Sequence, residues 1–301
     1  MKRSLKYRTL CSILLFLSHG VLAQHQLKPN TNPGLLWEIS GKGMKAPSYL
    51  FGTYHLVGKS FLDTLPVVID QLRKVKTVVG ELIMEDEMSM AKKLIPLMVL
   101  KKGSLENILS TKEYAETDSF LRLKTGMNLN VLNGLKPSAV QITLIAFLIP
   151  KDISPQNPAL DMFFQTEAKK LSIPVLGLET LEEQGAVIFD DSIRRQKELL
   201  LKTVRESDRM IEESKALFES YKRQDLKAIE SAFLKNDDYT PEEMNALLAK
   251  RNKRWIAEIP ALMTKGPVFF AVGAGHLVGN DGLITLLKNL GYTLTPKALK
   301  Y

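Results

Sequence analysis

Two histidines of this chain occupy the same position in a phrase that occurs twice. Residues 52–58 read Gly-Thr-Tyr-His-Leu-Val-Gly and residues 273–279 read Gly-Ala-Gly-His-Leu-Val-Gly, so His55 corresponds to His276. Each copy follows an apolar, strand-like run. A single histidine at such a position would most simply cap a helix or hydrogen-bond within a core. Two matching copies favour a functional role for both.

The phrase has the composition expected where a strand ends at a ligand site. Its first glycine permits backbone angles closed to other residues, so the chain can turn outward after the strand. The histidine then lies just past the carboxyl end of the strand, where open α/β sheets bind ligands. We therefore expect the two phrases on neighbouring strands of one sheet, with their imidazoles facing each other across a crevice.

Two glutamates also stand at the ends of apolar runs. Glu81 lies in the β-branched run 76–82, and Glu179 ends the run 173–179. A carboxylate in so apolar a stretch is costly unless it has a partner, so Glu81 is a strong candidate for the same site. Glu179 stands immediately before a helix whose dipole its charge would complement, and a structural role is favoured for it.

These residue types permit chemistry with or without a metal ion. Two histidines and one or two carboxylates suit zinc, iron, manganese or cobalt, and an ion with an open position would acidify a bound water. Sharing one ion would place the imidazole nitrogens within roughly 3–5 Å of each other. Without a metal, His55 would act as general base with Glu81 orienting it. The spacing matches no compact motif such as His-Glu-x-x-His, so both chemistries stay open.

Arg251 is the candidate for stabilising negative charge that develops during a reaction. It lies next to Asn252 in a helical stretch that begins at Thr240-Pro241. Asn252 has no evident structural duty in that stretch. A contact of Arg251 with substrate or with an oxyanion is therefore favoured.

The elements that must position these residues alternate between strands and helices. This alternation predicts an α/β fold with a central mixed β-sheet, flanking helices and a helical insertion. The first two strands are expected to form a hairpin across Gly41-Lys42-Gly43, and the charged stretch 190–235 to form a long helical hairpin over the sheet. The expected strands are 37–40, 49–52, 76–82, 173–179, 267–273 and 292–295; the expected helices include 65–75, 86–101, 111–124, 138–149, 160–171, one beginning after 180, one beginning at 241, and 280–290.

The N-terminus has the pattern of an export signal. Four basic residues precede the apolar run 10–17, and Val21-Leu22-Ala23 forms a small-residue cleavage site, so a signal peptide cut after Ala23 is predicted. The apolar run is too short for a membrane span, which needs about 20 residues. The only cysteine, Cys11, lies inside the signal. The mature chain is therefore expected to be periplasmic or extracellular, without disulfides, a thiolate nucleophile or a transmembrane span.

Charge and length set further limits on partners and domains. Cleavage would remove four positive charges and lower the formal net charge from +8 to +4. Basic residues do not cluster with aromatic ones, so nucleic acid is not an expected partner. After a flexible leader at 24–36, residues 37–301 are expected to form a single domain with a helical insertion at about 190–260.

Several motifs carry a family resemblance. They are Tyr-Leu-Phe-Gly-Thr-Tyr-His at 49–55, Val-Val-Gly-Glu-Leu at 78–82, Leu160-Asp161, Pro-Val-Leu-Gly-Leu-Glu-Thr at 174–180, Arg251-Asn252 with Trp255, and Val-Gly-Ala-Gly-His-Leu-Val-Gly at 272–279. In their order and spacing the chain resembles the TraB/GumN family, which is related to the Tiki-type proteases and more distantly to erythromycin esterases and ChaN-like proteins. The resemblance covers about residues 35–297.

The resemblance implies an active site and three classes of function. The site would comprise His55, Glu81 and His276, which are also the implied metal ligands, with Arg251 as a further catalytic residue; additional candidates are Glu179, Asp161 and Asn252. The favoured function is a secreted hydrolase that depends on manganese, cobalt or zinc and acts on peptides. The alternatives are a metal-independent, esterase-like hydrolase of small molecules with His55 as general base, and a non-catalytic protein that binds a ligand, haem or iron.

Overall fold

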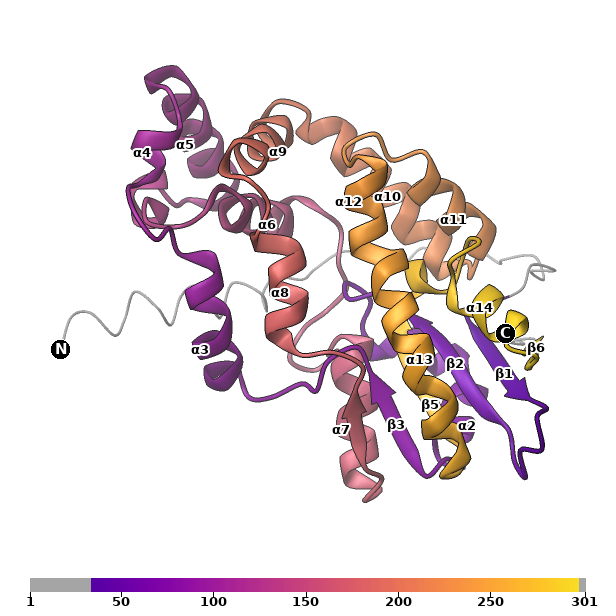
Figure 1. The fold of residues 1–301 in the computed structure, drawn as a ribbon. Coiled ribbons are helices and arrows are strands. Elements are labelled where there is room, and N and C mark those ends of the chain that lie inside the picture. The colour runs from indigo at the N-terminus through magenta and orange to yellow at the C-terminus, as the bar shows by residue number, and fades with distance from the viewer. Residues whose placement is uncertain (1–33, 298–301) are drawn as a thin grey trace. The chain divides into compact units, whose positions relative to one another are not determined.

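The computed structural model describes residues 34–297, which divide into two compact units (Figure 1). The sheet unit consists of residues 34–84, 151–180 and 216–297, and the helical unit of residues 85–150 and 181–215. The predicted signal peptide and most of the predicted leader lie outside the described residues. The single domain predicted for 37–301, with its insertion at about 190–260, stays a prediction.

Six strands in the described part of the chain form one mixed sheet, as predicted. Their order across the sheet is β4-β3-β5-β2-β1-β6. β1 and β2 form the predicted antiparallel hairpin, β6 pairs with β1 antiparallel, and β5 pairs in parallel with both β2 and β3. The strands are β1 (Leu36–Ser40), β2 (Ser48–Thr53), β3 (Thr77–Gly80), β4 (Val175–Gly177), β5 (Val268–Gly273) and β6 (Thr293–Pro296).

Four neighbouring strands run parallel, and this arrangement determines where the site lies. β4, β3, β5 and β2 are adjacent and point the same way, so their carboxyl ends meet at one edge of the sheet. Strands inside a parallel sheet are covered on both faces and therefore read as continuous apolar runs. β5 has this character, because its first five residues are buried. The repeated phrases begin at the ends of β2 and β5, which confirms the prediction that they come from neighbouring strands.

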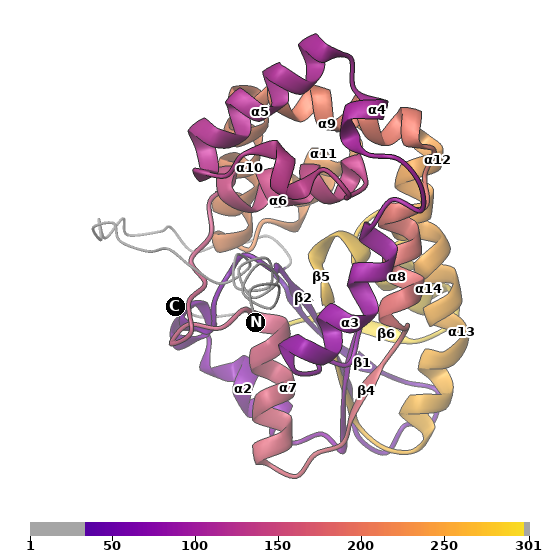
Figure 2. The same cartoon turned by 90° about the vertical axis from the view of Figure 1, so that its left-hand side faces the viewer.

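Helices cover both faces of the sheet within the sheet unit (Figure 2). α2 and α7 lie on one face, where Phe164 of α7 packs against Phe51 and Phe269 with ring centroids 5.3 and 5.2 Å apart. α13 and α14 lie on the other face, where the buried Trp255 belongs to α13. The helices of this unit are α2 (Pro66–Leu72), α7 (Leu160–Lys170), α11 (Leu226–Leu234), α12 (Pro241–Met244), α13 (Lys250–Thr264) and α14 (Leu283–Asn289), with 3₁₀ turns η1 (Lys59–Thr64) and η4 (Ala274–His276).

The helix that carries Arg251 begins with the predicted N-terminal signals. The hydroxyl of Thr240 accepts a hydrogen bond from the Glu243 N–H, and Pro241 occupies the first turn. α12 continues through a π-helical turn, η3 (Asn245–Ala249), directly into α13. π-turns rotate the residues that follow relative to a regular helix. This turn therefore helps to set the direction in which Arg251 faces.

The helical unit has a core of its own. α6 and α9 pack together around apolar side chains, among them Leu121, Leu144 and Leu200, which are fully buried. Two buried hydrogen bonds also join these helices: Ser138 donates to Gln196 at 2.8 Å, and Gln141 donates to Thr203 at 3.1 Å. The helices are α3 (Glu87–Met98), α4 (Leu105–Ile108), α5 (Thr111–Thr125), α6 (Pro137–Leu148), α8 (Leu181–Phe189) and α9 (Ile193–Arg205), with the 3₁₀ turn η2 (Leu129–Leu132).

One element prediction was wrong. The stretch 190–235 forms three helices, α9, α10 (Ser207–Lys222) and α11, instead of one long hairpin. α10 continues from the helical unit into the sheet unit, whose part of the chain resumes at 216. The chain turns after α10 at Gln224, which has a positive φ of 57°. Breaks between helices are hard to detect in such a charged stretch, because the helical spacing of apolar residues continues on both sides of each break. Among residues 34–297 no helix has both the length and the apolar character needed to cross a membrane.

Candidate functional site

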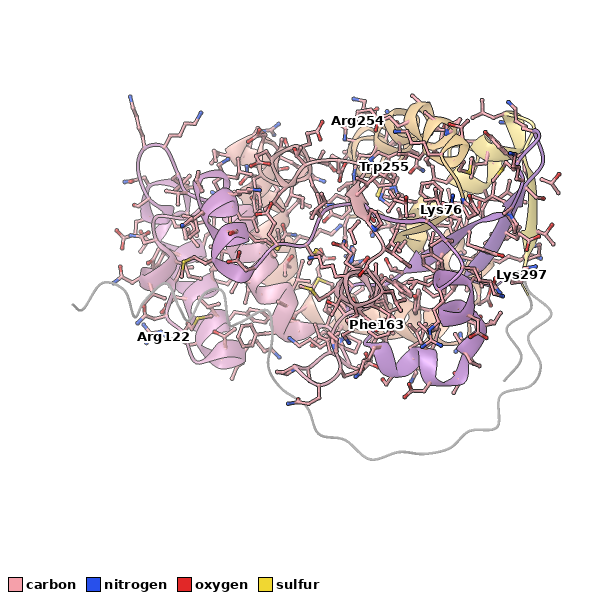
Figure 3. The ribbon with its side chains drawn as sticks, turned by 90° about the horizontal axis from the view of Figure 1, so that it is seen from below. Lys76, Arg122, Phe163, Arg254, Trp255 and Lys297 are labelled. Carbon is pink, nitrogen blue, oxygen red and sulfur yellow. The ribbon has the colours of Figure 1, made fainter. Side chains whose placement is uncertain are left out.

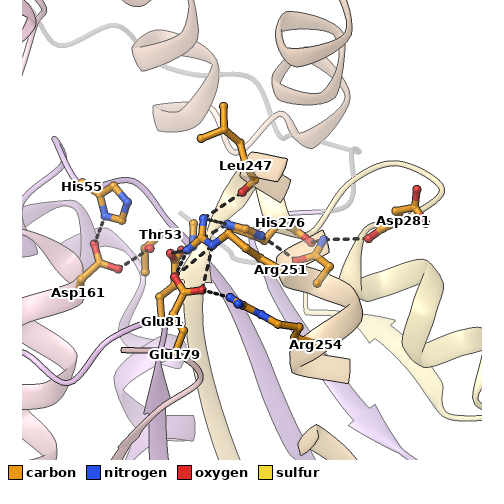
Figure 4. A network of polar contacts seen from close by, with 12 residues as sticks. Thr53, His55, Glu81, Asp161, Glu179, Leu247, Arg251, Arg254, His276 and Asp281 are labelled. Atoms are coloured by element: carbon orange, nitrogen blue, oxygen red, sulfur yellow. Dashed lines mark hydrogen bonds and ion pairs between the residues drawn. The ribbon is translucent and has the colours of Figure 1, made fainter. Parts of the chain in front are cut away.

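The parallel strands bring the predicted residues to one edge of the sheet (Figure 4). His55 follows β2, Glu81 follows β3, Glu179 follows β4, and His276 ends the turn that follows β5. Because these strands are neighbours in the order β4-β3-β5-β2, the four side chains come from four adjacent strand ends. They divide into two groups, one around Arg251 and one around His55.

Arg251 lies at the centre of the first group. Its Nη2 donates to Glu81 and to Glu179, each at 2.5 Å, and its Nε lies 3.1 Å from both oxygens of Glu179. Its Nη1 donates to the carbonyl of Leu247 at 3.0 Å and to Nε2 of His276 at 2.9 Å. These contacts use all five N–H groups of the guanidinium. The oxyanion role predicted for Arg251 would require one of them to leave its present partner.

A second arginine from the same helix completes the pairing of Glu179. Arg254 donates to the other side of this carboxylate at 2.9 Å, and its side chain is 48% exposed. Figure 3 labels Arg254 beside Trp255, the next residue of the helix, which is buried. Glu179 thus joins β4 to α13 through two arginines; the role predicted for it, complementing the dipole of the helix that follows, stays a prediction.

Glu81 is held as a carboxylate by contacts on both of its oxygens. One oxygen accepts the N–H of Gly273 at 2.7 Å, and the other accepts from Arg251. Burial raises its pKa, but the charges of His276, His55 and Arg251, together with the Gly273 N–H, outweigh burial and lower the pKa to about 2. A Cβ at Gly273 would lie 3.1 Å from a Glu81 oxygen. The glycine of the second phrase therefore permits the close approach of this carboxylate.

His276 is a buried, neutral hydrogen-bond acceptor. The side-chain amide of Asn252 donates to the carbonyls of His276 and Asp281, so its Oδ1 faces Nδ1 of His276, 2.7 Å away. This network assigns the ring proton to Nδ1 and leaves Nε2 to accept from Arg251. Burial lowers the pKa of His276 to about 4, against the opposing effect of Glu81. Asn252 thus has a clear structural duty, contrary to the expectation from sequence.

His55 is exposed and paired differently. Its Nδ1 lies 2.8 Å from Asp161, whose other oxygen accepts a hydrogen bond from Thr53 at 2.7 Å. The imidazole is 64% exposed, and among residues 34–297 no group hydrogen-bonds to its Nε2. The charge of Asp161 is the main cause that raises the pKa of His55 to about 9. The arrangement is an oriented imidazole with one nitrogen open to a substrate or water.

The loop before α7 connects Asp161 to the first phrase. Asp152 accepts the N–H of Gly58 at 2.6 Å and donates its own N–H to the carbonyl of Leu56 at 3.0 Å. Leu160 donates its N–H to the carbonyl of Val57 at 3.1 Å. These contacts join residues 56–58 of the first phrase to the loop and to the start of α7. They therefore fix Asp161, which lies in the first turn of that helix, beside His55.

Two of the side chains in these groups, those of Thr53 and Arg254, were not predicted from the sequence. Thr53 lies inside the first phrase. A hydroxyl at the end of a buried strand was the feature of the sequence that could have indicated its role. Arg254 follows Arg251 by three residues, the spacing at which two helical side chains reach the same neighbour. Every predicted site residue lies in one of the two groups.

The predicted metal ligands do not fit an ion in this arrangement. Both oxygens of Glu81 and both nitrogens of His276 already have partners, and Nε2 of His276 points at the guanidinium of Arg251. His276 Nε2 and Glu81 lie 3.8 Å apart. Within residues 34–297 no group of three or more histidine, cysteine, aspartate or glutamate side chains is placed to hold a metal ion.

Comparisons with known proteins identify the family. The model of the TraB/PrgY/gumN family matches residues 35–296, so the chain belongs to this family. Similar curated proteins include Metalloprotease TIKI1 and Metalloprotease TIKI2 of Danio rerio, each 25% identical over 85% of this chain and over 62% and 60% of their own lengths. Metalloprotease TIKI homolog of Amphimedon queenslandica is 24% identical over 95% of this chain and 65% of its own length. The chain therefore spans less than two thirds of these relatives.

Proposed function

We propose that this protein is a hydrolase that cleaves amide bonds in peptides, with His55 transferring the proton of the attacking water. The observation that carries the proposal is the geometry of His55: Nδ1 is held by Asp161 and Nε2 is open, at a sheet edge where α/β proteins bind ligands. The names of the relatives, which are metalloproteases, support the peptide substrate. We further propose that the protein is exported after cleavage near Ala23.

The chemistry follows from the two nitrogens of His55. In its neutral form, Nε2 takes a proton from water while the water oxygen attacks the carbonyl carbon of the substrate. Asp161 stabilises the imidazolium that forms, and Thr53 holds Asp161 in place. When the C–N bond breaks, Nε2 returns the proton to the leaving nitrogen. Since the pKa of His55 is raised to about 9, the base form increases towards alkaline pH.

The Arg251 group has a supporting part in this proposal. Arg251 joins the ends of β3 and β4 to α13, and His276 and Asn252 attach the end of β5 to the same helix. Buried, fully bonded charges of this kind hold the strand ends in fixed positions. The ends of β3, β4 and β5 are thereby held in place beside β2, the strand that carries His55.

Whether the proposed hydrolysis depends on a metal ion is a separate question. A divalent ion would supply an acidified water and would polarise the substrate carbonyl. The predicted ligands for such an ion are His55, Glu81 and His276, which do not fit an ion in the present arrangement. The mechanism above therefore uses only the protein's own side chains.

The proposal is tested with purified protein and with general substrates for amide and ester hydrolysis. Quenched fluorescent peptide libraries report amide cleavage, and p-nitrophenyl acetate reports the esterase alternative. We expect peptide cleavage that is reduced at least about 100-fold in His55→Gln, as is typical for loss of a general base. His25→Gln, a change of the same type in the leader, serves as control. Cleavage unaffected by His55→Gln, or folded protein with no turnover of either substrate, would refute the proposal, and the latter would favour a ligand-binding protein.

A further inference from the structure

The strand at one edge of the sheet is the least covered of the six. Among the described residues β4 pairs with β3 alone, so its other side is an edge of the sheet. β4 has no buried residue, whereas each of the other five strands of this sheet buries at least one. Leu176, at its centre, is 39% exposed. The edge of β4 therefore lies at the surface of the sheet unit.

Alternate residues of β4 direct their backbone groups away from β3. The carbonyl of Pro174 accepts the N–H of Val78 at 2.9 Å, so positions 174 and 176 bond to β3. The N–H and C=O groups of Val175 and Gly177 consequently face outward. Within residues 34–297 these four groups have no hydrogen-bond partner. They form the row of unpaired donors and acceptors with which a further strand can pair.

Exposed apolar side chains gather around this edge. Leu171 ends α7 just before β4 and is 41% exposed. Ile83 is 48% exposed, and its backbone nitrogen would lie 3.1 Å from a Cβ added at Gly177. The other large apolar side chains that are exposed in the described sheet unit, Leu234 and Leu290, lie at the ends of α11 and α14. The edge of β4 thus combines unpaired backbone groups with apolar contact surface.

The opposite edge of the sheet is protected against pairing. In β6 the N–H of Lys297 donates to the carbonyl of Leu36 at 2.9 Å, so the alternate position 296 faces outward. That position is Pro296, which has no N–H to donate, and Lys297 places a charge beside it. Proline and lysine are common means by which edge strands avoid pairing. The outward positions of β4, Val175 and Gly177, have neither.

We propose that β4 binds an extended, apolar polypeptide segment, which adds to the six-stranded sheet as a further strand. An extended backbone presents donors and acceptors at the two-residue spacing of Val175 and Gly177, about 7 Å. Apolar side chains of that segment would contact Leu176 and Ile83. The bound segment would lie four strand spacings, about 19 Å, from β2, the strand that carries His55. The inference therefore concerns binding alone and holds whether or not the bound chain is cleaved.

Backbone N-methylation distinguishes strand addition from apolar adhesion. The probe is a fluorescein-labelled peptide of alternating valine and threonine with a lysine at each end. It is N-methylated at every second residue, so that one edge can bond and the peptide cannot stack on itself. A second peptide is N-methylated at every residue of the same stretch, which adds apolar surface but removes the donors from both edges.

Fluorescence anisotropy with the wild-type protein should show saturable binding of the first peptide. The Kd of the second peptide should be at least about tenfold weaker, because the outward carbonyls of β4 would be left without donors. Equal affinities of the two peptides, or no saturable binding of the first, would overturn the inference.

A charge on the edge and the exchange of its amides locate the binding. Leu176→Lys should weaken the Kd of the first peptide at least about fivefold, because it replaces an apolar contact by a charge. Leu234→Lys, the same change on the exposed end of α11, should leave the Kd unchanged. Amide hydrogen exchange of the wild type should slow at Val175 and Gly177 in the complex, a result that does not depend on any variant folding. Wild-type affinity in folded Leu176→Lys, or no protection of these two amides, would refute pairing with β4.

Discussion

Replacement of Asp161 by asparagine should lower the pKa of His55. The carboxylate lies 2.8 Å from Nδ1 and is the main cause that raises the pKa from 6.5 to about 9. An opposite charge at this distance moves a pKa by roughly 1–3 units. Because the imidazole is 64% exposed, solvent screens the pair, and we expect a decrease of roughly 1–2 units in Asp161→Asn.

NMR titration of the imidazole nitrogens measures this change without knowledge of a substrate. The chain has four histidines, and His55→Gln assigns the signal of interest. Asp70→Asn, a change of the same type on the exposed surface of α2, is the control and should leave the titration unchanged. If His55 titrates at the same pH in the wild type and in Asp161→Asn, the ion pair does not set its protonation and the reasoning is wrong.

The same pair has a signature in stability. The folded pKa of His55 is raised, so the pair stabilises the fold fully below about pH 6.5, and this contribution is lost as the pH rises through about 9. The difference in Tm between wild type and Asp161→Asn should therefore be larger near pH 6 than near pH 10. In any amide hydrolysis, kcat/KM should rise with pH through the pKa measured by NMR. In Asp161→Asn the rise should shift to lower pH.

Four further outcomes are expected. Glu179→Gln should lower the free energy of unfolding by about 3 kcal/mol in urea titration, because a buried ion pair loses one partner; a change below experimental error would exclude a structural role. Asn252→Ala should cost roughly 1–3 kcal/mol, since it leaves Nδ1 of His276 unpaired, and an unchanged melt would contradict the assigned network. Glu81 has its pKa lowered to about 2, so its contribution to stability is present above about pH 4.5 and lost as the pH falls towards 2; Glu81→Gln should flatten this acid limb. N-terminal sequencing of exported protein should begin at or near Gln24, and an intact first residue would refute cleavage.

Much of the fold could be predicted because its signals are local. Apolar runs bounded by glycine and proline marked the strands, and the capping residues Thr240 and Pro241 marked the start of a helix. The repeat also predicted that β2 and β5 are neighbours, because two matching histidines past the carboxyl ends of strands are expected to face one crevice. The order of the outer strands and the breaks within 190–235 depend on packing between distant segments, which single-sequence patterns do not record.

The pairing of charges could not be predicted for the same reason. Asp161 and His55 are 106 positions apart, and Arg251 and Glu81 are 170 apart. Which carboxylate a guanidinium contacts depends on how α13 lies across the sheet and on the π-turn before it. The sequence could show that a buried Glu81 needs a partner. It could not show that this partner is Arg251, nor that Asn252 holds His276.

The two histidines illustrate what a repeated phrase does and does not specify. Each phrase places its histidine past the carboxyl end of a parallel strand, yet the pKa of His55 is raised to about 9 while that of His276 is lowered to about 4. The difference comes from the neighbours. An aspartate pairs with the exposed ring, whereas burial under α13, with Arg251 on one ring nitrogen, keeps the other ring neutral. Environments that push the pKa values of two like groups apart commonly assign them different tasks. His55 is thereby suited to proton transfer, and His276 to holding the cation that faces it.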